Sequence, residues 1–219
     1  MQLLSVKAKY YCGIDLHARS MYLCVTTKAG TIKYHQELTN DATQFLAMVK
    51  PFLPSIVVGV ESTYNWYWLA DICTAHKIPF HVGHALYIKR FTARKQANDR
   101  IDSRSIAELL RTNRFPLAYG YPREMRITRD LLRRRHMFVR RRAGTYTHMQ
   151  NSFTQYGQFE SVYDTMRSKT ERQNLPPRFD DDELRFNAER DCDYLDALDS
   201  IIWKLNRRIR KQAVYHDPV

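Results

Sequence analysis

Apolar and polar residues alternate along the first forty residues in a pattern that predicts β-strands separated by turns. Residues 9–16, 21–27 and 31–38 are rich in aromatic and β-branched side chains. Lys28-Ala29-Gly30 separates the second run from the third and offers a glycine for positive φ. We therefore expect an antiparallel meander of three strands.

After this meander the pattern predicts helices that alternate with strands. Polar residues 39–41 begin a helix that should end near Lys50, before Pro51. The β-branched run at 55–61 predicts a buried strand that ends on Glu61. The remaining predicted elements are a helix at 64–76, a strand at 78–82, a short helix at 85–91 and a helix that begins at Asp99 or Asp102. This order predicts an α/β fold, with a mixed sheet and flanking helices, over residues 1–120.

The sequence pattern changes after Pro122. Two long helices are expected in a second region, 121–219. The first spans residues 123 to about 156, Gly157 and Pro176-Pro177 bound a connector, and the second spans 181 to about 213. The second helix carries a heptad seam, which predicts a helical hairpin or a coiled coil. The seam consists of Leu184, Ala188, Asp191, Leu195, Leu198, Ile202, Leu205 and Ile209.

Net charge, apolar content and cysteine spacing limit the kinds of partner and site that this chain is expected to have. The formal net charge of +12 favours a polyanionic partner. No run of 18 apolar residues is present, so we expect no membrane partner. The four cysteines are scattered, which argues against a zinc site or a disulfide framework and suits a cytoplasmic protein.

Four acidic residues stand at positions that would bring them together. Asp15 and Glu61 lie at the ends of apolar strands, and Asp99 and Asp102 share one face of a helix. If the strands at 9–16 and 55–61 are neighbours, these carboxylates converge and repel each other unless a cation binds. Mg²⁺, or Mn²⁺, is the expected cofactor. Taken singly, each residue has a simpler explanation, as a solvated turn residue or a helix cap.

Three segments resemble the motifs of the DEDD-type insertion-sequence transposases, a family that includes the Piv-like DNA invertases. They are Cys12-Gly13-Ile14-Asp15-Leu16-His17, Val58-Gly59-Val60-Glu61-Ser62-Thr63 and Lys95-Gln96-Ala97-Asn98-Asp99-Arg100-Ile101-Asp102. The resemblance implies a ribonuclease H-like, RuvC-like domain with Asp15, Glu61, Asp99 and Asp102 as the catalytic and metal-binding tetrad. It also implies DNA as substrate and a structured guide RNA as partner.

Family members continue into a C-terminal domain with a serine nucleophile and a Pro-Gly-Ile-Gly-like loop. The sequence has no such loop, and we expect a truncated transposase. A transposase must bring two DNA ends together, so a dimer or higher homo-oligomer is a further expectation.

Arginines dominate residues 111–142, which contain 11 of them and no lysine. Arginine binds phosphate bidentately and stacks on bases, which predicts a nucleic-acid-binding helix. The expected contacts are Lys95, Arg133, Arg134, Arg135, Arg140, Arg141 and Arg142. The alternative is a solvated helix face with ion pairs to residues 180–183. Lys89, Arg90 and Arg94 are weaker candidates.

Other polar and aromatic residues near the tetrad have structural interpretations. Tyr64, Trp66, Tyr67 and Trp68 are more typical of a core than of a base-stacking platform. Ser62 and Thr63 are expected as helix caps, and His17, close to Asp15, as a structural histidine.

Two other functions remain open at this point. A stand-alone structure-specific DNA nuclease would cut branched DNA without a second domain. A non-catalytic nucleic-acid-binding module would bind DNA or RNA and need no metal.

Overall fold

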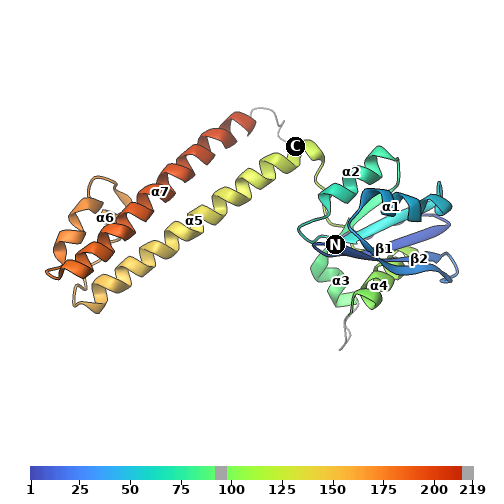
Figure 1. Cartoon of the computed structure of the whole chain (residues 1–219), viewed down its shortest axis with the longest axis horizontal. Helices are drawn as coiled ribbons and strands as arrows, with labels where there is room; N and C mark the ends of the chain where they lie inside the picture. The colour runs from blue at the N-terminus through green and yellow to red at the C-terminus, as the bar shows by residue number, and fades with distance from the viewer. Residues whose placement is uncertain (92–97, 214–219) are drawn as a thin grey trace. The chain divides into compact units, whose positions relative to one another are not determined.

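The chain folds as two compact units. The computed structural model describes residues 1–91 and 98–213, and the units are Met1–Arg123 and Glu124–Val219 (Figure 1). No helix in the described ranges has the length and the apolar character needed to cross a membrane.

The first unit is built on one mixed five-stranded sheet of order β3-β2-β1-β4-β5. Its strands are β1 (Tyr10–Leu16), β2 (Ser20–Thr27), β3 (Ile32–Thr39), β4 (Ile56–Glu61) and β5 (Phe80–Gly83). The pairs β1–β2 and β2–β3 are antiparallel, as the predicted meander requires. The strands β1, β4 and β5 are parallel to one another.

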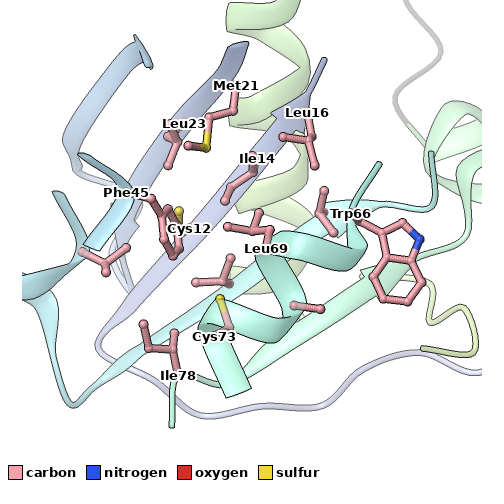
Figure 2. Close-up of a cluster of buried hydrophobic side chains, with 14 of the residues drawn as sticks. Cys12, Ile14, Leu16, Met21, Leu23, Phe45, Trp66, Leu69, Cys73 and Ile78 are labelled. Carbon is pink, nitrogen blue, oxygen red and sulfur yellow. The ribbon is translucent and has the colours of Figure 1, made fainter. Parts of the chain in front are cut away.

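Helices lie on both faces of this sheet. They are α1 (Ala42–Val49), the short 3₁₀ helix η1 (Lys50–Phe52), α2 (Tyr67–Ala75), α3 (Ala85–Phe91) and α4 (Asp99–Arg111). On one face, alternate strand residues such as Cys12 and Ile14 pack with Phe45 of α1 and Leu69 of α2 (Figure 2). On the other face, Tyr11 and Val57 pack with residues of α3 and α4. This α/β arrangement fits the predicted ribonuclease H-like fold.

Two local predictions for the first unit were wrong. The predicted helix at 64–76 begins only at Tyr67, and Tyr64 is 76% exposed rather than part of the core. Trp66 is buried as expected. In the loop between Glu61 and Tyr67, the Thr63 hydroxyl donates to Asn65 Oδ1, and the Asn65 amide donates to the backbone carbonyl of His17. Side-chain to backbone hydrogen bonds of this kind compete with helix formation.

The second unit contains two long helices, α5 (Arg123–Gln155) and α7 (Asp182–Ala213). The two helices run antiparallel side by side (Figure 1). The Nε2 atom of His148 on α5 lies 3.7 Å from a carboxylate oxygen of Asp191 on α7. The Arg142 guanidinium on α5 donates to a carboxylate oxygen of Asp199 on α7 at 2.7 Å. Four members of the predicted seam, Ala188, Leu195, Leu198 and Ile202, are buried. Ala188 and Leu195 share a core cluster with Phe153 of α5.

The connector between the long helices is folded, which the sequence analysis did not predict. It contains α6 (Tyr163–Arg167) and the 3₁₀ helices η2 (Arg172–Asn174) and η3 (Pro176–Arg178). Val162, Met166 and Phe179 of this segment pack against Phe153 of α5. The side chain of Arg172 is 1% exposed and binds Asp196 and Asp199 of α7.

Candidate metal centre

Asp15 and Glu61 lie at the carboxyl ends of two adjacent parallel strands. Ile14 pairs with Val60 in the β1–β4 register, so the acidic residues follow immediately on both strands. The two strands are neighbours, as the predicted convergence required. Strand alternation points Asp15 and Glu61 to the face that α4 covers, and the Asp15 side chain is only 13% exposed.

Asp99 and Asp102 both lie in the first turn of α4. The N-cap of this helix is Asn98, whose Oδ1 accepts a hydrogen bond from the backbone N–H of Ile101 at 2.9 Å. The alternative in which Asp99 merely caps the helix is therefore wrong. The positive end of the helix dipole favours carboxylates in this turn.

Gly13 allows α4 to lie directly on β1. A Cβ atom at this position would be 2.2 Å from both the Ser103 carbonyl oxygen and the Ala107 nitrogen. Those atoms belong to the helix backbone, so a side chain on Gly13 could not be accommodated by a rotamer change. The close approach brings the first turn of α4 towards Asp15, two residues further along the strand.

The carboxylates perturb one another. Burial raises the pKa of Asp15, and the charges of Asp99 and Asp102 raise it further, against the lowering effect of His17. Burial also raises the pKa of Glu61, with added contributions from Asp15 and Asp102. The pKa of Asp102 is raised by burial and then by Asp99. The four acidic residues thus belong to one electrostatic cluster that is unfavourable when fully ionised.

His17 lies inside this cluster. Its Nε2 is 3.2 Å from an Asp15 carboxylate oxygen and 3.3 Å from one of Asp99. Its backbone carbonyl accepts hydrogen bonds from the side-chain amides of Asn40 and Asn65. The sequence analysis placed His17 close to Asp15, and the structure adds its contact with Asp99.

The other candidates near the centre have different positions. Lys89 is near enough to lower the pKa of Glu61. Arg90 stacks on Tyr87. Ser62 accepts a hydrogen bond from the Ala85 N–H at the start of α3. The expectation that Ser62 and Thr63 cap the helix after Glu61 was wrong, since the N-cap of α2 is Trp66. Arg94 and Lys95 lie outside the described residues.

The six arginines of α5 that were predicted as nucleic-acid contacts divide into two groups. Arg135 donates to Asn206 and Arg142 to Asp199, so both are directed at α7 rather than at solvent. The second group is exposed, and it consists of Arg133, Arg134, Arg140 and Arg141. No ion pair between α5 and residues 180–183 is found among the described residues, where Asp182 instead pairs with Arg185.

The donor set suits a hard divalent cation. Among the described residues, single donor atoms of Asp15, His17 and Asp99 all lie within 4.8 Å of one another. Carboxylate oxygens are the preferred ligands of Mg²⁺, and Mn²⁺ accepts the same oxygens and also imidazole nitrogen. A cation here would also offset the like-charge repulsion that adds to the effect of burial in raising the pKa of Asp15.

Comparison with known proteins agrees with this geometry. No curated protein matches the chain. Residues 12–158, more than half of the chain, match the model of the transposase family named for its DEDD motif and for IS110. The match includes Asp15, Glu61, Asp99, Asp102 and all of α5. The chain therefore belongs to the IS110-type DEDD transposase family.

Proposed function

We propose that Asp15, Glu61, Asp99 and Asp102 hold Mg²⁺ or Mn²⁺, and that this centre acts on DNA phosphodiesters during transposition. One observation carries the proposal. Two carboxylates at the ends of adjacent parallel strands lie on the sheet face that α4 covers, and α4 carries two more in its first turn. Burial raises the pKa values of Asp15, Glu61 and Asp102, and like charge within this group raises them further. A cluster of this kind is unfavourable for the protein alone and becomes favourable when a cation binds.

Each group has a distinct task in this proposal. A bound divalent cation would polarise a phosphate and activate an attacking oxygen. Asp15 and Glu61 provide ligands from the sheet, whose backbone is fixed by pairing on both sides. Lys89, which already lowers the pKa of Glu61, adds positive charge where a phosphate would approach.

We further propose the exposed arginines of α5 as the main nucleic-acid contacts. Arg133, Arg134, Arg140 and Arg141 are available to phosphates, whereas Arg135 and Arg142 hold the two long helices together. Lys95 remains a proposed contact on the strength of the family motif. Family membership and the basic helix support a structured guide RNA as a second nucleic-acid partner. The long antiparallel helices would form a coiled-coil arm in a dimer or higher assembly.

Calorimetry with Mn²⁺ on the full chain tests the metal centre. We expect Asp15→Asn and Asp102→Asn to abolish binding or weaken it at least about tenfold, because each removes a charged ligand. Glu171→Gln, which removes an exposed carboxylate from the second unit, is the matched control and should bind as the wild type does. Equal Mn²⁺ affinity in the wild type and Asp15→Asn would refute the proposed centre. No binding by the wild type, even with DNA present, would favour a non-catalytic nucleic-acid-binding module.

A further inference from the structure

His35 makes a tertiary hydrogen bond to the helix that carries Asp99 and Asp102. It lies on β3, at the edge of the sheet, and is half-buried. Its Nε2 is 2.8 Å from the backbone carbonyl oxygen of Arg100, 65 residues away in the sequence. A carbonyl oxygen only accepts hydrogen bonds, so the Nε2 atom must carry the proton and donate.

The surroundings hold the His35 ring in place. The ring of Tyr22 packs edge-on against it, with centroids 5.4 Å apart. Tyr22 is the β2 residue that pairs with Asp15. The Ser103 hydroxyl also donates to the Arg100 carbonyl, at 3.1 Å, and lies 3.4 Å from Nε2. The Arg100 carbonyl is thus the point where the sheet and the first turn of α4 meet.

Other anchors of α4 act elsewhere. The Asn98 cap bonds within the helix and moves with it. The close packing on Gly13 involves Ser103 and the residues that follow. Arg111, in the last turn, donates to the Lys28 carbonyl at 3.1 Å. Among the described residues, the first turn is tied to the sheet by His35 and by the contact of His17 with Asp99.

We propose that His35 is a positioning residue for the acidic centre. Through the Arg100 carbonyl it fixes the first turn of α4, and with it the distance of Asp99 and Asp102 from Asp15 and Glu61. The inference rests on the proposed metal centre for its functional meaning. Outer-shell hydrogen bonds of this kind typically contribute 10–100-fold to metal affinity.

Mn²⁺ calorimetry on the full chain, with thermal melting of each variant, tests the proposal. We expect His35→Ala to weaken Mn²⁺ binding about tenfold or more. His35→Gln should restore affinity to within about threefold, because the glutamine amide nitrogen can reach the position of Nε2 and donate. Two controls should keep the affinity of the wild type. Gln36→Ala changes the next, exposed residue of β3, and Phe45→Leu lowers stability through the core on the opposite face.

Hydrogen exchange provides a readout that does not depend on metal. His35→Ala should accelerate amide exchange about tenfold or more in residues 101–104 while leaving the last turn of α4 unchanged. Wild-type affinity in His35→Ala, or equal weakening in Phe45→Leu, would overturn the positioning role. If the wild type binds no Mn²⁺, the proposed function fails. The exchange rates of residues 101–104 in His35→Ala then decide whether His35 holds the first turn of α4. Rates equal to those of the wild type would reject that role.

Discussion

Replacing Gly13 by alanine tests how the acidic centre is assembled. The backbone at Gly13 is ordinary strand, so alanine meets no conformational barrier there. Its Cβ would, however, lie 2.2 Å from two backbone atoms of α4, where ordinary contact begins near 3.4 Å. The helix must therefore move away from β1 by about 1 Å, and a gap of that size removes a quarter to half of the attraction between the surfaces that separate.

The expected cost follows from which atoms must move. Overpacking of a core typically costs about 1–3 kcal/mol, and backbone atoms of a packed helix yield less than side chains, so we expect about 3 kcal/mol for Gly13→Ala. Gly59→Ala is the matched control, because Gly59 lies on the neighbouring strand β4 and faces the same helix, α4. Its Cβ would meet the Leu110 side chain, with the nearest atom at 2.8 Å. A side chain can rotate, and alanine also lowers the entropy of the unfolded chain, so this change should cost within about 1 kcal/mol.

Urea unfolding followed by tryptophan fluorescence measures both changes. A Trp203→Phe background leaves Trp66 and Trp68 as reporters of the first unit, and Trp203 is largely exposed, so its removal is tolerated. Mn²⁺ affinity, measured on the folded protein, should fall for Gly13→Ala and stay near the wild-type value for Gly59→Ala. The reasoning is wrong if the two alanines cost the same, or if Gly13→Ala binds Mn²⁺ as tightly as the wild type.

Three further predictions use other parts of the chain. Because burial and repulsion raise the folded-state pKa values of Asp15 and Glu61, the metal-free protein binds protons more tightly when folded. The ionised carboxylates therefore destabilise the folded protein fully above their raised pKa values, and this destabilisation disappears as the pH falls to ordinary carboxyl pKa values. The urea midpoint of the wild type should rise over that pH range through this contribution, and the midpoint of Asp15→Asn should rise less. Arg172→Met leaves Asp196 and Asp199 without their buried partner and should cost about 3 kcal/mol, seen by circular dichroism in urea, while an unchanged midpoint would contradict the buried ion pair. Glutamine at the four exposed arginines of α5 should weaken DNA binding and reduce the slope of log affinity against log salt by about 0.9 for each lost phosphate contact, whereas an unchanged slope would exclude them as contacts.

The sheet of the first unit was predictable because its strands carry a strong local signal. The run Ile56–Val60 is apolar and β-branched, and the meander that precedes it is broken by a turn sequence at Gly30, which has positive φ in the structure. The four acidic candidates stood out because they lie at the ends of apolar strands and at the start of a helix. Their assignment as a tetrad came from the resemblance to the DEDD-type transposases. What the spacing could not supply was the pairing of β1 with β4, which depends on contacts between distant segments.

Residues that act through tertiary contacts gave no usable local signal. His35 lies on an exposed edge strand, and its bond to Arg100 spans 65 residues. Arg172 would be read as a surface residue in a polar connector, yet it is buried between carboxylates of α7. The folded connector was missed for the same reason, because its apolar residues are scattered over short turns without a helical or strand period. Tyr64 shows the reverse error, since an aromatic cluster in sequence predicted core where the loop exposes one of its members.

The position of α4 reflects opposing forces along its length. At its first turn, Asp99 and Asp102 are pushed away from Asp15 and Glu61 by like charge whenever no cation is bound. Gly13 holds the middle of the helix by close packing, and Arg111 holds the last turn through its hydrogen bond to the Lys28 carbonyl. Repulsion at one end and anchors at the other would open the first turn before the helix detaches. A hydrogen bond at the Arg100 carbonyl opposes that motion at the point where the repulsion acts, so a weakened His35 contact should disturb the metal centre before it disturbs the fold.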